Sequence, residues 1–237
     1  MRKVIDWKNL KVLKESEEGF GIILDNAGFI DPTMEKNVGI MESYREPLSL
    51  QQNKDMIVYA LLQTYDKENR NGRIYPKKVL QDNVEKYQKV IKERRALNEL
   101  NHPETSVIDL ERVSHEIIET WWEGQNLWGK LKILTSPGFK NHGYVGNYAP
   151  DIAANLLLNG VTIGISSRGI GSLKKEGSKN IVQSDYELIC FDLVSQPSNF
   201  SSWVHPSRDF MDSLSEQVQT KKTINEEIIK SLDNFLL

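Results

Sequence analysis

Stretches rich in apolar residues predict several strands. Residues 56–64 are apolar on both alternating faces, which is typical of a strand covered on both sides. Two further stretches flank Gly124 closely enough to predict a β-hairpin. A shorter apolar run at residues 20–24 is compatible with one more strand. The main strands are predicted at residues 56–64, 114–122, 127–134, 161–167 and 185–195.

Two segments carry the signals of helices. The first begins at Pro76, where the missing N–H of proline costs nothing, and ends in a basic cluster at Arg95. Its apolar positions recur at helical spacing and form one stripe: Leu80, Val84, Tyr87 and Ile91. The second covers residues 152–158, with Pro150 near its start and Gly160 just past its end.

Strands and helices do not alternate strictly along the chain, which disfavours a parallel doubly wound sheet. The sequence therefore predicts an α+β fold, a mostly antiparallel β-sheet or small β-barrel flanked by helices. Residues 1–50 carry scattered charges and turn signals and predict a loosely attached leader or propeptide-like extension. Residues 51–206 predict the folded domain, and residues 207–237 predict a charged helical tail.

Composition narrows the classes of function. The 237 residues carry a net charge of −3, which gives no general attraction to nucleic acid. The single cysteine, Cys190, excludes an internal disulfide framework and a thiolate zinc cluster, and it fits a reducing compartment. No apolar run approaches the length of a membrane span, and no signal peptide is predicted. No cofactor and no metal site are predicted.

The segment from Val161 to Gly171 holds the first candidate for chemistry. Alternation along a strand places Ser166 on one face and Ser167 on the other, with Ile165 on the face of Ser167. Gly164, two residues earlier, is expected to leave open space beside the hydroxyl of Ser166. Ser166 is therefore the better placed of the two serines to meet a substrate.

A serine hydroxyl needs a neighbouring base to become a nucleophile, and the chain offers four histidines. His142 lies in a turn-rich loop, His205 lies near the tail, and His115 belongs to a predicted strand. His102 precedes Pro103 in a tight connection, which would hold its ring in one orientation. From the residues alone, a structural role for His102 is an equal alternative.

Asp192 is the third candidate because it interrupts a run that is apolar on both faces. A carboxylate cannot be buried there without a partner. A histidine that becomes cationic during catalysis would be such a partner, and the carboxylate would orient it. A purely structural salt bridge, for example to Arg168, is the alternative.

Five blocks of the sequence resemble the prohead core proteases of T-even phages and their relatives. The resemblance spans roughly residues 56–204, with the blocks in the same order and at similar spacing. The blocks are Asn69 to Pro76, Glu99 to Pro103, Trp121-Trp122, Gly164 to Ser172 and Phe191 to Val194.

The resemblance implies a fold and roles for individual residues. It implies a closed β-barrel flanked by helices, like the herpesvirus assemblins, and a serine endopeptidase activity. His102 matches the position of the family's base, Ser166 that of its nucleophile and Asp192 that of the third member, with Glu187 and Glu104 as alternatives for Asp192. The backbone near Arg168 and Gly169 is the candidate for oxyanion and substrate binding.

The resemblance also implies substrates and a setting. Such enzymes cut phage scaffold and capsid proteins inside the prohead, in the host cytoplasm, after a glutamate that follows Ile or Leu by two residues. Matching sites at Glu42, Glu216 and Glu226 flank the predicted domain and predict self-processing of a zymogen. A homo-oligomer is expected by analogy with the assemblins, with no requirement for nucleic acid or membrane.

Two other functions compete with this interpretation. A non-catalytic scaffold or capsid-assembly protein could keep the fold without the chemistry. A metal-dependent hydrolase could use His102 with Glu104 and Asp109, although no second histidine follows at the spacing of a His-Glu-x-x-His motif.

Overall fold

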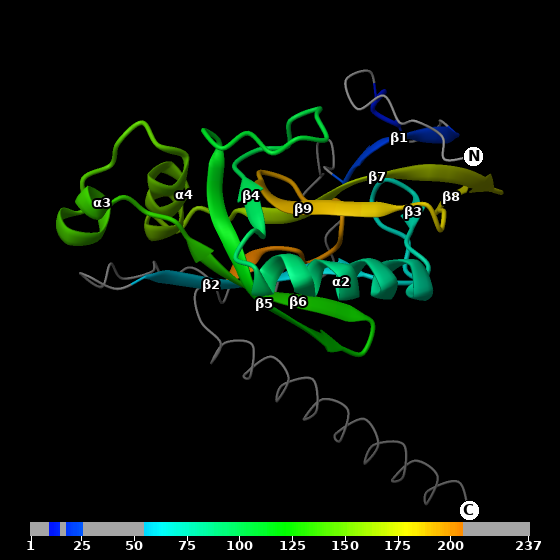
Figure 1. The fold of residues 1–237 in the computed structure, drawn as a ribbon, viewed down its shortest axis with the longest axis horizontal. Coiled ribbons are helices and arrows are strands. Elements are labelled where there is room, and N and C mark those ends of the chain that lie inside the picture. Colours follow the sequence, from blue (N-terminus) through cyan, green and yellow to red (C-terminus); the bar gives the residue numbers. More distant parts are fainter. Residues whose placement is uncertain (1–9, 15–17, 26–54, 206–237) are drawn as a thin grey trace, which may run out of the picture.

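The computed structural model describes residues 10–14, 18–25 and 55–205. The predicted tail and the three predicted self-cleavage sites, Glu42, Glu216 and Glu226, lie outside the described residues. The strands and helices of the described part are shown in Figure 1.

Ten strands form two five-stranded sheets in the described part of the chain. In the first sheet, β7 pairs with β1, β8 and β9, and β8 also pairs with β3. Its strands are β1 (Gly19–Leu24), β3 (Arg73–Ile74), β7 (Gly164–Glu176), β8 (Lys179–Val182) and β9 (Glu187–Val194). In the second sheet the order is β10, β2, β6, β5 and β4. Its strands are β2 (Met56–Thr64), β4 (Leu97–Glu99), β5 (Val113–Glu123), β6 (Asn126–Ile133) and β10 (Val204–His205).

The pairings confirm a mostly antiparallel β-fold, since among the described strands only β3 and β8 run parallel. The two sheets do not close into the barrel that the sequence predicted. Single bridges link them instead, between Leu100 and Leu193 at one place and between Gly164 and Trp203 at another. The core fills the space between the sheets with residues such as Leu62, Leu131 and Phe191.

Helix α2 (Lys77–Lys92) follows Pro76 as predicted, and its apolar stripe packs on β5 and β9. Because it contacts one strand of each sheet, α2 joins the two sheets along one side (Figure 1). The side chain of Asn83 reinforces this junction, because its Oδ1 accepts the N–H of Leu188 in β9 at 2.9 Å.

Two shorter helices lie together at one end of the molecule (Figure 1). Helix α4 (Ala149–Leu158) was predicted, and it packs on β5 and β6. Helix α3 (Pro137–His142) was expected as a turn-rich stretch. Its ends nevertheless carry capping signals, because the Oγ of Ser136 accepts the N–H of Phe139 and Gly143 ends the helix in the left-handed conformation.

Strand β1 corrects the expectation of a loosely attached extension at the residues that the structure describes. All six of its residues pair with β7, from Gly19 opposite Leu173 to Leu24 opposite Arg168. Directly after β1, the buried carboxylate of Asp25 lies 3.1 Å from Nη1 of the buried Arg73. This stretch is therefore an integral strand of the first sheet, fixed at its end by a buried ion pair.

The Arg73–Asp25 pair predicts a large effect on stability. Replacing Arg73 with methionine leaves the Asp25 carboxylate buried without its cation, so the free energy of unfolding should fall by about 3 kcal/mol. Urea denaturation of wild type and variant measures the difference. Lys78→Met is the matched control, because the Lys78–Asp82 pair is exposed and should change stability by less than about 0.5 kcal/mol. Equal losses in both variants would contradict the assignment of Asp25 as a buried anchor.

Candidate active site

The pairing of β7 with β9 brings Ser166 and Asp192 together. The two residues are directly opposite each other in the antiparallel register, and side chains at such positions lie on the same face of a sheet. Arg168 and Cys190 form the next pair on that face. The alternation predicted from sequence is thus confirmed: Ser166 shares a face with Asp192, and Ser167 lies on the other face.

The loop after β4 places His102 beside this pair. Leu100 bridges to Leu193, and the N–H of Asn101 donates to the carbonyl of Leu193 at 2.8 Å, so the loop is attached to β9 next to Asp192. Asn101 takes a left-handed conformation (φ 68°), which asparagine tolerates better than most residues. The chain then turns so that Nδ1 of His102 lies 2.6 Å from Oδ2 of Asp192.

The surroundings of Asp192 keep it ionised. Burial alone would raise its pKa, but the hydrogen bond and charge of His102, together with the charge of Arg168, hold the pKa below its ordinary value. An ionised carboxylate only accepts hydrogen bonds, so Nδ1 of His102 must carry a proton. With Nδ1 protonated, Nε2 is the nitrogen at which the ring can take up or release a proton, and it is buried without a hydrogen-bond partner among the described residues.

The hydroxyl of Ser166 is directed elsewhere. The residue is 3% exposed, and its Oγ donates to the main-chain carbonyl of Asp25, directly after β1. The same carbonyl accepts the N–H of Ser198 at 2.9 Å. Among the described residues, the hydroxyl of Ser166 therefore donates its hydrogen bond to Asp25 and not to Nε2 of His102.

Ser167 belongs to a separate buried network on the opposite face of β7. Its Oγ donates to Oδ2 of Asp25 at 3.1 Å and accepts from Nε2 of Gln63 at 3.1 Å. The open space expected beside Ser166 at Gly164 is absent. A Cβ atom at Gly164 would lie 2.4 Å from Pro197, so this glycine is needed because Pro197 packs against the backbone.

Arg168 and Gly169, the predicted oxyanion residues, have other surroundings. The guanidinium of Arg168 is buried and contacts Asp192 and Glu99 behind the His102–Asp192 pair. Gly169 is paired with β1 on one side and β9 on the other, and a Cβ atom there would lie 2.4 Å from the ring of Tyr186. The glycine therefore admits the tyrosine. The backbone of Arg168, like that of Gly169, lies between β1 and β9 in the sheet, so the oxyanion role predicted for this backbone stays a prediction.

The remaining candidates do not join the cluster. Glu104 and Glu187 are exposed, whereas Nδ1 of His102 is already committed to Asp192. No group of three potential metal ligands occurs in the part of the chain that the structure describes. Sequence reasoning missed Glu99, which is buried and contacts Arg168; its place three residues before His102 was the available signal.

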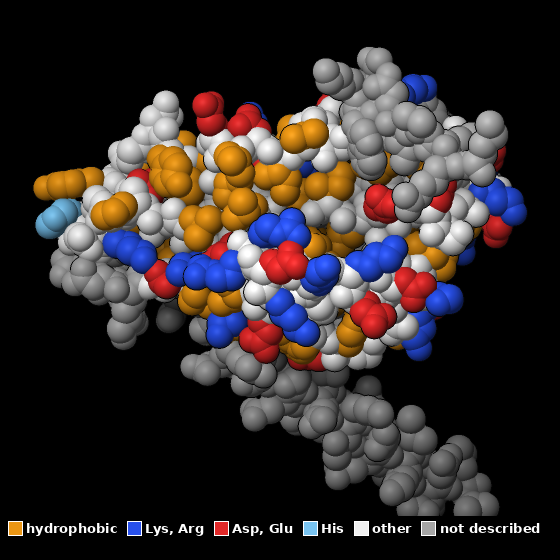
Figure 2. All heavy atoms as spheres, in the orientation of Figure 1, with side chains coloured by type: hydrophobic (Ala, Val, Ile, Leu, Met, Phe, Trp, Pro, Cys, Tyr) orange, Lys and Arg blue, Asp and Glu red, His pale blue; other side chains and the backbone are white. Residues whose placement is uncertain are grey.

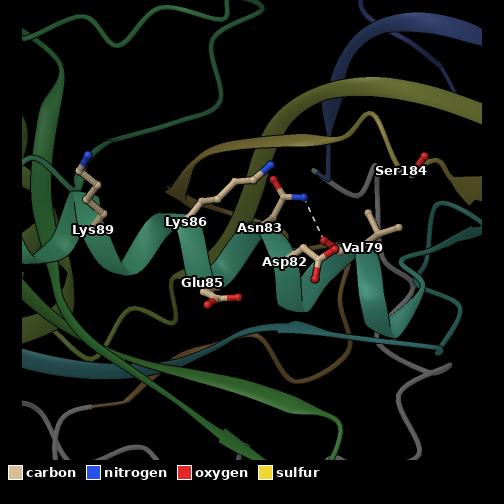
Figure 3. A pocket seen from close by; sticks show the side chains of 7 residues that line it. All are labelled: Val79, Asp82, Asn83, Glu85, Lys86, Lys89 and Ser184. Carbon is tan, nitrogen blue, oxygen red and sulfur yellow. Dashed lines mark hydrogen bonds between the residues drawn. The ribbon is translucent and has the colours of Figure 1, made fainter.

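A second feature of the described part of the chain lies away from the candidate residues. An open hollow beside α2 is lined by charged and polar side chains and contains none of the predicted site residues (Figure 3). On the face drawn in Figure 2, basic and acidic side chains alternate along the band where α2 lies. No helix among the described residues is long and apolar enough to cross a membrane.

Comparison with known proteins shows which family the chain resembles. Residues 40–214 match the family model described as prohead core protein serine protease. The prohead core protein protease of Enterobacteria phage T4 is 33% identical over 156 residues, which cover 64% of this chain and 68% of the phage protein. The chain belongs to the prohead core protein serine protease family.

A solved structure shows the same fold as this prohead protease. The bacteriophage T4 capsid assembly protease, gp21, aligns with a TM-score of 0.56 and 23% identity, over 76% of this chain and 99% of that one. At this identity the likeness supports the fold alone. Membership of the family makes the chain a phage peptidase of capsid maturation, as the sequence blocks predicted.

The four histidines differ in environment, and this predicts a pH dependence of stability. His142 is exposed, whereas burial lowers the pKa of His115 to about 4, against a smaller opposing influence of Asp192. An unfolded histidine titrates near pH ~6.5. Between about pH 4 and pH 6.5 the unfolded chain therefore binds more protons at His115, so the stability should fall as the pH falls through this window.

Replacing His115 with glutamine should remove part of this dependence. Between pH 7 and pH 4.5, the variant should lose about 2 kcal/mol less of its free energy of unfolding than wild type. Urea denaturation at the two pH values gives both differences. His142→Gln should behave like wild type, and the same pH dependence in all three proteins would show that His115 does not contribute.

Proposed function

We propose that the chain is a serine endopeptidase in which Ser166 is the nucleophile, His102 the general base and Asp192 the third member. The single observation that carries the proposal is the state of His102. Its Nδ1 is held 2.6 Å from the carboxylate of Asp192, which is paired opposite Ser166, and its Nε2 is buried without a hydrogen-bond partner among the described residues. A ring held in this way can accept a proton at Nε2.

The reaction proposed follows from these roles. The Oγ atom of Ser166 attacks the carbonyl carbon of the scissile peptide bond and gives its proton to Nε2 of His102. The imidazolium formed is stabilised by Asp192 and then protonates the leaving amine. Water, deprotonated by the same nitrogen, hydrolyses the acyl-enzyme and releases Ser166.

In this proposal, the hydrogen bond from Ser166 to the carbonyl of Asp25 keeps the nucleophile in an inactive arrangement. A hydroxyl that donates to a main-chain carbonyl cannot donate to His102 at the same time. Activation then requires that Ser166 change its donor direction, or that the end of β1 move. Substrate binding and processing of the N-terminal region are the events that we propose for this change.

The substrates proposed are phage scaffold and capsid proteins, cut after glutamate in Ile-x-Glu or Leu-x-Glu sequences inside the prohead, in the host cytoplasm. The family membership supports the setting. The sequences ending at Glu42, Glu216 and Glu226 have the same form, and they support self-processing. A homo-oligomer is part of the same proposal.

Substitution of single residues tests the assignment of the nucleophile and the base. Ser166→Ala and His102→Ala should each lower kcat for a peptide with an Ile-x-Glu site by about 1,000-fold or more, because each removes a reacting group. Ser167→Ala should keep kcat within about tenfold of wild type, because its hydroxyl lies on the other face of β7. Mass spectrometry of the peptide products measures all four proteins.

The same assay also distinguishes the proposed protease from the competing function, a non-catalytic assembly protein. A wild-type protein that cleaves no peptide and no scaffold protein, even after removal of its termini, would favour the non-catalytic assembly protein. Loss of cleavage in Ser167→Ala with cleavage retained in Ser166→Ala would move the nucleophile to the neighbouring serine.

Self-processing predicts a change in intact mass. Wild type incubated at high concentration should lose mass in steps that match cleavage after Glu42, Glu216 or Glu226, whereas Ser166→Ala should keep its full mass. Glu42→Gln should block only the N-terminal step, because it removes the charge that the proposed specificity requires. Identical full-length masses in wild type and Ser166→Ala after long incubation would exclude self-processing under these conditions.

A further inference from the structure

We propose that Arg168 is a positioning residue, which holds Asp192 and both sides of the His102 loop in place with Glu99 as a second carboxylate partner. The inference rests on the proposed function of His102 and Asp192. It assigns Arg168 a role behind the reacting groups, in place of the oxyanion role expected from sequence.

The first contact of Arg168 fixes the direction of the Asp192 carboxylate. Nη2 of Arg168 donates to Oδ1 of Asp192 at 3.2 Å, and Nε, whose N–H donates to Sγ of Cys190, lies 2.9 Å from Oδ2 as an ion pair. A two-point contact of this kind sets the plane of the carboxylate as well as its position. Oδ2 of Asp192 contacts both Nε of Arg168 and Nδ1 of His102. The orientation of the imidazole therefore depends on the guanidinium.

The second set of contacts reaches the loop that carries His102. Nη2 of Arg168 lies 3.1 Å from Oε1 of Glu99, three residues before the histidine. Nη1 donates to the carbonyl of Thr105, three residues after it, at 2.9 Å. Oε1 of Glu99 also accepts the N–H of Asp109 at 2.7 Å, which fixes the end of the same loop. One guanidinium therefore holds the loop on both sides of His102.

Charge explains why an arginine is needed at this position. Arg168, Asp192 and Glu99 are each 0% exposed, so two carboxylates share one buried cation. Arg112 approaches Glu99 only to 3.6 Å and is 45% exposed, so it compensates the second carboxylate weakly. Without Arg168, the two carboxylates would disfavour each other's ionisation, and Asp192 would lose the charge that orients the imidazole.

The same contacts leave Arg168 unsuited to bind a substrate oxyanion. All three of its side-chain nitrogens contact groups of the protein. A lysine could not reproduce them, because an ammonium group lacks the planar fork that meets a carboxylate at two points. Arg168→Lys keeps the positive charge and removes the geometry, which makes it the informative substitution.

The test compares Arg168→Lys and the isosteric Glu99→Gln with wild type in the peptide assay. Arg168→Lys should lower kcat by about 100-fold with KM within about threefold, because displacement of the base by a fraction of an ångström affects the transition state more than ground-state binding. Glu99→Gln should lower kcat by about tenfold. Arg95→Lys is the control and should match wild type, because the Arg95 side chain is 65% exposed and contacts Glu93, outside the His102 loop.

A second readout reports on the His102–Asp192 bond without any proteolysis. Wild type should show a far-downfield proton NMR signal from Nδ1–H of His102, identified by its loss in His102→Ala. That signal should shift or disappear in Arg168→Lys while the protein remains folded by circular dichroism. If Arg168→Lys does not fold, Glu99→Gln decides through the same two measurements.

Two results would overturn the proposal. One is an unchanged Nδ1–H signal in the folded Arg168→Lys and Glu99→Gln variants. The other is a raised KM with kcat retained, which would place Arg168 in substrate binding. Failure of the proposed function itself is distinguishable, because wild type would then be inactive on the peptide while the NMR comparison still tests the positioning role.

Discussion

Asp192 is a carboxylate without access to solvent, and the arrangement of the candidate site follows from its need for partners. An isolated buried charge is strongly unfavourable, so the chain must supply compensating donors at this point. Three of them come from different parts of the fold: the imidazole of His102 from a loop, the guanidinium of Arg168 from β7 and the N–H of Glu99 from β4. The contacts of the Asp192 carboxylate thus join the two sheets near the bridge between Leu100 and Leu193.

Strand β7 is polar toward both of its faces, which is unusual for the central strand of a sheet. Ser166 and Arg168 belong to the Asp192 side, whereas Ser167 belongs to the Asp25 network with Gln63. Asp192 and Asp25 each contact a buried arginine, Arg168 for Asp192 and Arg73 for Asp25. The carbonyl of Asp25 reaches the hydroxyl of Ser166, so the network that anchors β1 also determines the state of the proposed nucleophile.

Sequence reasoning found the elements and residues whose signal is local. The β5–β6 hairpin, α2 and α4 were predicted because periodicity and capping residues act within a few positions. Asp192 stood out for the same reason, as a charge within an apolar run, although sequence could not decide between His102 and Arg168 as its partner; the structure has both contacts. Alternation along β7 likewise separated Ser166 from Ser167.

The features that sequence reasoning missed depend on contacts between distant segments. Nothing in residues 19–24 indicates β7 as their partner, and nothing near Gly164 indicates that Pro197 fills the space beside it. The contact of Arg168 with Asp192 was named from sequence, but its contacts with the segment around His102 were missed. Its partners there, Glu99 and Thr105, lie more than sixty residues earlier.

The pairing of β1 with β7 has a consequence for the order in which the protein can be made. Gly19 leaves the ribosome early, yet its partner Leu173 is synthesised much later, and Asp192 follows it. Contacts so distant in sequence form slowly, and until then the segment from Gly19 to Leu24 has no sheet to join. A nascent chain that ends between β7 and β9 can pair β1 with β7 but still lacks the carboxylate that orients His102. The restraint on Ser166 can therefore form before the His102–Asp192 pair exists.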